Sequence, residues 1–148
     1  MITEDSIEID APAPLVWQIF SDVEGWPAWT ASVTSLVARD GADLAVGKRF
    51  AIKQPGMSRL VWRVTEIDPG SSWTWVQRSP GVRVTARHWV TPQPGGRTLV
   101  RQQLDQRGLL GALVGRLMLK KTKRFLEQEA QGLKARSEQF GRASGSHA

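Results

Sequence analysis

Residues 32–107 constrain the fold most, because apolar and polar side chains alternate there in short segments that glycine and proline interrupt. A period of two residues is typical of β-strands, and short turns join antiparallel neighbours. The segment therefore predicts an antiparallel meander of about six strands. The interrupting turns are Gly41, Gly47, Pro55-Gly56, Pro69-Gly70, Pro80-Gly81 and Pro94-Gly95-Gly96. The expected strands are residues 32–39, 48–54, 58–67, 72–79, 82–91 and 97–107.

A further strand and two short helices are expected before this meander. Residues 3–10 alternate with Ile7 and Ile9 on one face, which predicts a strand. The first short helix should begin in the proline-rich segment 11–14, because proline tolerates the first helical turn. The second should follow Asp22 as its cap. The sheet is thus expected to have about seven strands.

The pattern changes after Gly108, where helical spacing continues to about Phe140. A length of 148 residues predicts one domain over residues 1–140, and the small residues of 141–148 predict a flexible tail. One face of the sheet must be covered, and only the C-terminal helix is long enough to cover it. The predicted fold class is α+β, with a curved antiparallel sheet wrapped around a long C-terminal helix.

Three segments carry a resemblance to a known family. They are Ala11-Pro12-Ala13-Pro14-Leu15-Val16-Trp17 after the first strand, Asp22 with Trp26-Pro27-Ala28-Trp29, and Gly95-Gly96-Arg97-Thr98 at the start of the last strand. In these segments and in the order of its elements, nearly the whole chain resembles the START-like helix-grip superfamily, also called SRPBCC. Within it, the chain resembles the bacterial polyketide cyclase/dehydrase-like proteins.

The resemblance implies a deep pocket between the sheet and the long helix. The superfamily includes cyclases, lipid carriers and quinone-binding proteins. We therefore expect this chain to bind or transport a hydrophobic or aromatic small molecule, such as a lipid, a polyketide or a quinone-like compound. Because one fold supports many activities, the pocket lining has to decide between this function and catalysis.

Alternation assigns the strand residues to two faces of the sheet. The inward set is apolar apart from a histidine and a glutamine: Phe50, Ile52, Leu60, Trp62, Val64, Trp73, Trp75, Val82, Val84, Ala86, His88, Val90, Val100, Gln102 and Leu104. The outward set is basic: Arg49, Lys53, Arg59, Arg63, Arg78, Arg83, Arg87, Arg97 and Arg101.

The inward tryptophans have two interpretations. They line a cavity for a flat or apolar ligand, as the resemblance favours, or they fill the core, since aromatic side chains are usually buried. The candidate ligand-binding residues are Trp26, Trp29, Phe50, Trp62, Trp73, Trp75, Val84, His88, Gln102, Leu104, Met118, Thr122 and Phe125.

His88 is the candidate catalytic residue, because an imidazole titrates near physiological pH. It supports an alternative function as an aromatic polyketide cyclase or dehydratase, which would enclose its substrate in the cavity. A buried histidine bonded to the backbone is the other interpretation. Gln77, Gln102 and Gln106 share the inward phase, where they meet either a ligand or solvent at an open strand end.

The expected long helix has two apolar sides. One arc should face the sheet and comprises Met118, Leu119, Thr122, Phe125, Leu126, Ala130 and Leu133. Leu110, Leu113 and Leu117 project from nearly the opposite side. These three leucines have three interpretations: burial under neighbouring loops, a dimer contact, or contact with an anionic membrane surface. The sequence pattern alone does not distinguish between them.

A net charge of +6 favours association with an anionic partner. The outward Arg59, Arg63, Arg83 and Arg87, with Trp89, support a lesser alternative of nucleic-acid binding. No recognised nucleic-acid motif accompanies them, so a solvated face is the expected interpretation.

Several kinds of chemistry are not expected. The chain has no cysteine and no recognisable nucleotide-binding or metalloprotease motif, so we expect neither a cofactor nor a metal. The chain shows neither an apolar run long enough to cross a bilayer nor a signal-peptide pattern, which favours a cytoplasmic protein. The expected partner is a hydrophobic small molecule, and the chain is expected to be a monomer or a homodimer.

Overall fold

The computed structural model describes residues 1–145, in which seven strands form one antiparallel sheet. In space the strands follow the order β1-β7-β6-β5-β4-β3-β2. The elements are β1 (Ile2–Ile9), α1 (Ala13–Ser21), the 3₁₀ helix η1 (Val23–Ala28), β2 (Ser35–Ala38), β3 (Arg49–Lys53), β4 (Leu60–Asp68), β5 (Ser72–Ser79), β6 (Val82–Gln93), β7 (Arg97–Arg107), α2 (Gly111–Leu117) and α3 (Leu119–Gly145). The predicted α+β helix-grip fold is confirmed.

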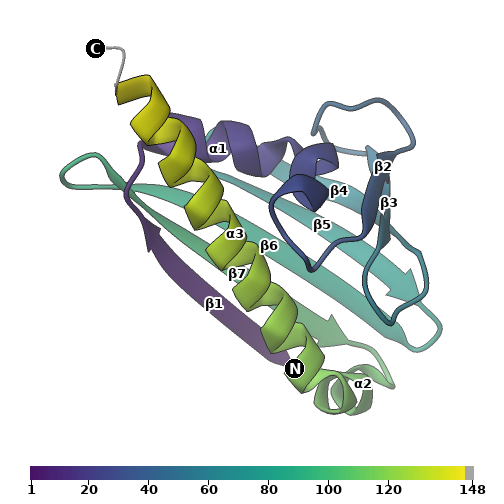
Figure 1. Ribbon diagram of the computed structural model, residues 1–148. Helices are drawn as coiled ribbons and strands as arrows, with labels where there is room; N and C mark the ends of the chain where they lie inside the picture. The colour runs from purple at the N-terminus through teal and green to yellow at the C-terminus, as the bar shows by residue number, and fades with distance from the viewer. Residues whose placement is uncertain (146–148) are drawn as a thin grey trace.

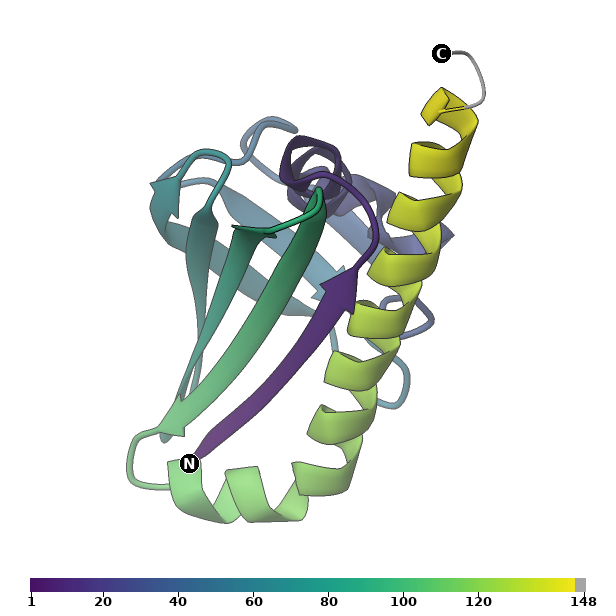
Figure 2. The same ribbon diagram turned by 90° about the vertical axis from the view of Figure 1, so that its left-hand side faces the viewer.

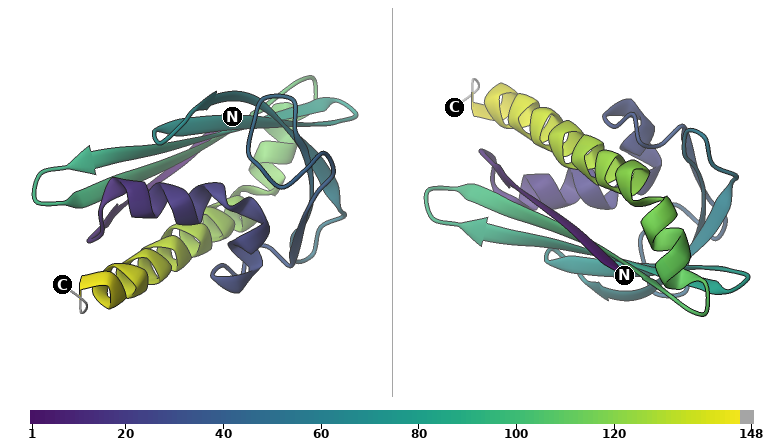
Figure 3. Two further views of the ribbon diagram at one scale, coloured as in Figure 1. Left: turned by 90° about the horizontal axis from the view of Figure 1, so that it is seen from above. Right: turned by 90° about the horizontal axis from the view of Figure 1, so that it is seen from below.

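The sheet curves around α3, which crosses its concave side (Figure 1). Consecutive strands from β2 to β7 pair as a meander, and β1 closes the order by pairing with β7. Helix α1 contacts α3 as well as β6 and β7, so it lies between the sheet and the long helix (Figure 3). Helix η1 contacts β2. These two short helices therefore close one end of the space under α3.

The predicted single C-terminal helix is wrong, because the helix breaks at Met118. A Cβ added to Gly111 or Gly115 would lie within about 3.0 Å of atoms of Gln106, and at Gly115 also of Met1. The two glycines thus let α2 approach the ends of β7 and β1 closely. Since α3 must leave in another direction to cross the sheet, the chain turns between the two helices (Figure 2).

The long helix also extends further than expected, to Gly145 rather than about Phe140. The predicted tail of residues 141–148 is therefore helical over its first five positions, and its remaining three lie outside the described residues. A salt bridge between Lys134 and Glu138, four residues apart at 2.7 Å, supports the helix just before these positions.

Gly132 is the point of closest approach between α3 and the segment after η1. A Cβ at this position would lie 2.0 Å from the carbonyl oxygen of Trp29. A larger residue at position 132 would push Trp29 and α3 apart, so glycine here allows the segment after η1 to pack directly against α3.

The two faces of the sheet differ as predicted. Phe50, Val64 and Val100 on the inner face are almost fully buried. Arg83, Arg97 and Arg101 on the outer face are exposed. Over the described part of the chain, no helix combines the length and the apolarity that crossing a bilayer requires.

Candidate ligand-binding cavity

A cavity of about 410 Å³ lies between the inner face of the sheet and α3. Its volume falls in the range of small-molecule sites. The walls are mostly apolar: Trp62 from β4, Trp75 from β5, Val84 and Ala86 from β6, Leu104 from β7, and Met118, Phe125 and Leu126 from the helical side. Sheet and helix thus enclose a space that an apolar molecule can occupy.

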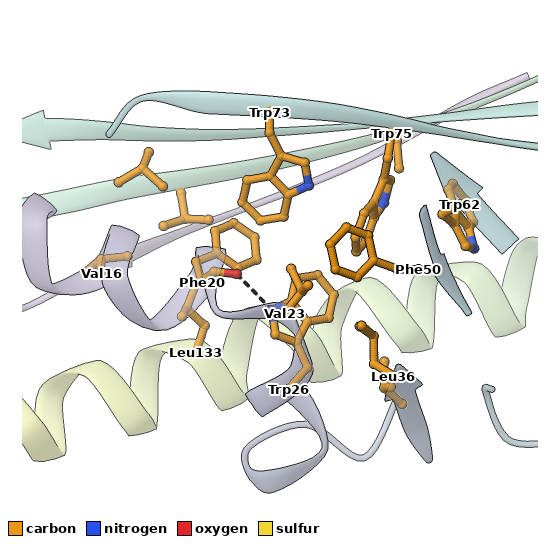
Figure 4. Packing of buried hydrophobic residues seen from close by; sticks show 14 of the residues in the cluster. Val16, Phe20, Val23, Trp26, Leu36, Phe50, Trp62, Trp73, Trp75 and Leu133 are labelled. Carbon is orange, nitrogen blue, oxygen red and sulfur yellow. Dashed lines mark hydrogen bonds between the residues drawn. The ribbon is translucent and has the colours of Figure 1, made fainter. Parts of the chain in front are cut away.

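A cluster of aromatic rings packs together in the core (Figure 4), and its members Trp26 and Trp75 line one end of the cavity. Phe20 stacks on Trp26 at 5.5 Å between ring centroids and meets Trp73 edge-on at 4.7 Å. The indole Nε1 of Trp26 donates a hydrogen bond of 2.8 Å to the carbonyl of Phe20. Trp75 packs against Trp26 at 5.8 Å and joins this cluster to the cavity wall. We call Phe20, Trp26, Trp73, Trp75 and His88 the aromatic floor.

His88 is held within the aromatic floor rather than free in the cavity. Its ring stacks on Trp73 at 4.0 Å, and its Nδ1 lies 3.2 Å from the Trp73 carbonyl oxygen. Because a carbonyl only accepts, Nδ1 must carry the hydrogen, which leaves Nε2 as an acceptor. Burial lowers the pKa of His88 to about 3, more than the bond to Trp73 raises it. The imidazole is therefore neutral at physiological pH.

Two buried glutamines among the residues that line the cavity have unpaired side-chain acceptors. The side-chain oxygens of Gln102 and Gln106 have no hydrogen-bond partner among the described residues. The amide nitrogen of Gln102 donates a long hydrogen bond, 3.5 Å, to the carbonyl of Leu126. The third predicted glutamine, Gln77, is engaged by Ser79. A buried acceptor without a donor is costly, so Gln102 and Gln106 favour a cavity content that can donate hydrogen bonds.

Glu129 is the functional candidate that the sequence reasoning missed. It lines the cavity from α3 and accepts a hydrogen bond of 3.2 Å from the hydroxyl of Ser32, which in turn lies 2.9 Å from that of Thr30. Burial raises the pKa of Glu129 to about 8, and the negative charge of Asp5 adds to the shift. The side chain is therefore mostly a neutral carboxylic acid at pH 7.

A signal for Glu129 was present in the helical spacing. It follows Phe125 by four residues and precedes Leu133 by four, so it belongs to the arc that faces the sheet. A single carboxylate among apolar residues on a buried arc is a candidate site group.

The other end of the cavity is open. Ser58 and Pro80 line it and are exposed, and Met57 and Ser79 beside them are half-buried. They belong to the β3–β4 loop and the β5–β6 turn, and α2 contributes Val114. Exposed wall residues mark where a cavity meets solvent, so the mouth lies between these two connections and α2.

Ten of the predicted ligand-binding residues line the cavity: Trp26, Trp62, Trp75, Val84, His88, Gln102, Leu104, Met118, Thr122 and Phe125. Trp29, Phe50 and Trp73 do not. Trp73 is covered by His88 and Phe20, Phe50 packs against Trp75, and Trp29 lies beside Gly132. These three side chains pack in or against the core, and ligand binding by the other ten stays a prediction.

The leucines on the far side of the C-terminal helices are exposed. Leu113 is 56% and Leu117 76% exposed, and Leu110 is 46% exposed. Leu110 lies against the β5–β6 turn at Gly81, but the exposure of Leu113 and Leu117 shows that no part of the described chain buries them. A dimer contact and a membrane contact remain as the two interpretations of these exposed leucines.

The outer face carries a shallow basic groove. It is lined by Arg49, Arg63, Arg78, Arg83 and Arg87, together with threonines and valines of β4 to β6. Trp89, the outward ring predicted to stack on bases, is covered by the Arg101 guanidinium at 4.8 Å. Across residues 1–145, no three metal-ligating side chains come together.

Comparisons with known proteins agree with this architecture. Residues 2–138 match the model of a family described as polyketide cyclase/dehydrase and lipid transport. A search of curated proteins finds no match.

Solved structures with the same fold include proteins with quite different descriptions. The Zhui aromatase/cyclase from Streptomyces sp. R1128 is 18% identical, with a TM-score of 0.79 over 98% of both chains. A START superfamily protein from Mycobacterium smegmatis is 20% identical, with a TM-score of 0.72 over 94% of this chain and 98% of the other. A hypothetical protein from Helicobacter pylori is 16% identical, with a TM-score of 0.78 over 93% of this chain and 88% of the other.

At these identities the structural likeness shows a shared fold, and the family model adds membership over most of the sequence. The chain therefore belongs to the family described as polyketide cyclase/dehydrase and lipid transport.

Proposed function

We propose that this protein binds an apolar or aromatic small molecule between the aromatic floor and the mouth of the cavity. The observation that carries the proposal is an apolar cavity of about 410 Å³ that is closed at one end and open at the other. A large, well-formed apolar pocket with a few polar groups is the usual form of a ligand site. The family, which includes lipid transport in its description, supports the same conclusion.

The polar groups on the walls favour a particular kind of ligand. Gln102 and Gln106 offer unpaired acceptors, and the neutral Glu129 offers a donor. A flat molecule that carries hydroxyl and carbonyl groups on a largely apolar frame would satisfy all three side chains. Neither a fully charged ligand nor a pure hydrocarbon fits this set, because each would leave polar groups unmatched.

A cavity-filling pair of variants tests the proposal. Val84 and Val76 lie on neighbouring strands, but Val84 lines the cavity and Val76 the outer groove. Val84→Phe should weaken uptake of an apolar fluorescent probe at least about tenfold, since the added ring occupies ligand space. Val76→Phe should bind the probe as the wild type does. Equal binding by both variants would locate the probe outside the cavity.

A second candidate function is dehydration or cyclisation of a polyketide-like substrate. Glu129 favours it, because a carboxyl that stays protonated near pH 7 can give its proton to the leaving hydroxyl. The carboxylate that remains can take the proton from the carbon next to the carbonyl, so that water leaves, a C=C bond forms and the acid is restored. His88 contributes less than expected for a general base, since a group with a pKa of about 3 binds a proton weakly. Its Nε2 suits it to accept a hydrogen bond and orient a substrate.

The absorbance of a new conjugated double bond tests this candidate with an aryl β-hydroxy ketone as substrate. Glu129→Gln should abolish turnover but still bind the substrate, because glutamine keeps an oxygen for Ser32 and loses the acidic proton. If the wild type binds the substrate but does not turn it over, the catalytic function is excluded for this substrate and only the binding function is supported.

A further inference from the structure

We propose that α2 docks this protein on a lipid bilayer that carries anionic phospholipids. The docking surface is the leucine patch, which we define as Leu109, Leu110, Leu113 and Leu117. These side chains are 100%, 46%, 56% and 76% exposed, respectively. Four large apolar side chains within nine residues of a soluble chain indicate a contact surface.

The leucines cannot turn inward. The opposite side of α2 is held by Gly111 and Gly115, where an added Cβ would lie within about 3.0 Å of atoms of Gln106. The hydrogen bond of 2.9 Å from the Leu110 amide to the Gly81 carbonyl also fixes the start of the helix. The close packing of Gly111 and Gly115 against the sheet therefore keeps the leucine patch on the exposed side of α2.

The charge beside the leucine patch favours an anionic occupant. Arg116 lies between Leu113 and Leu117, while Lys120, Lys121, Lys123 and Arg124 follow the patch, and no acidic residue occurs between Asp105 and Glu127. Among the described residues, Arg116, Lys120 and Arg124 have no ion pair within 4.0 Å. Apolar side chains that enter the headgroup region and basic ones that meet lipid phosphates are the two components of interfacial binding.

A bilayer fits this surface better than a second copy of the chain. In a symmetric dimer each patch would face itself, which would bring the two sets of basic side chains together. The segment contains no acidic residue that could form an ion pair across the dimer, so the repulsion between the basic side chains would remain. An anionic lipid surface instead satisfies the leucines and the charges at once.

The leucine patch lies beside the cavity mouth. Val114 and Met118 line the cavity, while Leu113 and Leu117 on the same stretch are exposed to solvent. Figure 2 shows α2 at the end of the molecule, where β7 leads into it and β1 begins. Docking would thus bring the mouth against the membrane. The docking itself depends on the leucine patch and its charges, not on the cavity having a ligand.

Flotation with vesicles tests the proposal on the full chain. The vesicles contain phosphatidylcholine alone or with about 30% phosphatidylglycerol, which gives them a negative surface charge. The wild type should float with the anionic vesicles, and binding should fall at high salt. The double variant Leu113→Ser/Leu117→Ser should lose at least about tenfold in partitioning. Val46→Ser, at a loop valine that is 62% exposed, is the matched control and should float as the wild type does.

Further variants separate the proposal from its rivals. Lys120→Glu/Arg124→Glu should abolish the preference for anionic lipid, and Val84→Phe should float normally even if it no longer takes up a cavity probe. Circular dichroism checks that each variant is folded, and the substituted side chains of the patch and of its charges are exposed. A wild type that stays in the soluble fraction, a double variant that floats normally, or a leucine-dependent dimer that ignores vesicles would each overturn the proposal.

Discussion

The two ends of the cavity are built in opposite ways. The aromatic floor consists of large rings that hold one another, and Phe20 and Trp73 in it are almost fully buried. The mouth is formed by the β3–β4 loop, the β5–β6 turn and the seven-residue α2, and its side chains are largely exposed. The difference indicates that the floor supplies stability and a rigid surface, whereas the mouth supplies contacts with the surroundings.

Removal of a ring from the floor should have the largest effect on stability. Phe20 contacts Trp26, Trp73 and His88, so Phe20→Ala leaves a void that rigid neighbours cannot fill. We expect a loss of about 4 kcal/mol in the free energy of unfolding, measured by chemical denaturation. Leu117→Ala at the mouth should change it by less than about 0.5 kcal/mol. Similar losses at both positions would contradict the division between floor and mouth.

The next effect concerns Glu129 and depends on pH. The unfolded carboxyl loses its proton near 4.5, but the folded one keeps it to about 8, so stability falls as pH rises between these values. Glu129→Gln lacks this penalty. The variant should match the wild type below pH 4.5 and exceed it by on the order of 3 kcal/mol at pH 7.

Denaturation curves at several pH values measure this difference. Glu127→Gln, which replaces an exposed carboxyl on the same helix, is the control and should keep the wild-type slope. If Glu129→Gln shows the wild-type slope as well, Glu129 is ionised in the folded protein, and the proposed donor is lost.

The contact between α3 and Trp29 gives a smaller effect. Gly132→Ala should cost about 2 kcal/mol, because the new methyl group would collide with the Trp29 carbonyl. At Gly141, an added Cβ would lie 3.6 Å from Ala11, an ordinary contact. Gly141→Ala should therefore stabilise the protein by up to about 1 kcal/mol through helix propensity. Thermal unfolding measures both, and equal shifts would show that α3 is not held at Gly132.

The sequence predicted most of the fold, because its strands alternate clearly and its turns are marked by glycine and proline. The helix break at Met118 was missed because the apolar pattern continues through it. What breaks the helix is tertiary contact at Gly111 and Gly115, which local spacing does not reveal.

The site was predicted less completely, since alternation gives the face of a residue but not its depth. Trp73 and Trp75 share a strand face, yet only Trp75 reaches the cavity, because His88 covers Trp73. Glu129 was missed for a different reason. Burial raises the pKa of its carboxyl, and the depth of a side chain is known only from the three-dimensional structure.

Native mass spectrometry of freshly purified protein, followed by extraction and identification of any bound molecule, shows whether the cavity holds a ligand. A ligand site in this cavity predicts a one-to-one adduct with an apolar or aromatic compound in the wild type and in Val76→Phe, and its loss in Val84→Phe. An adduct that persists in Val84→Phe, or a bare mass for a wild type that also fails to take up an apolar probe, would contradict a ligand site in this cavity.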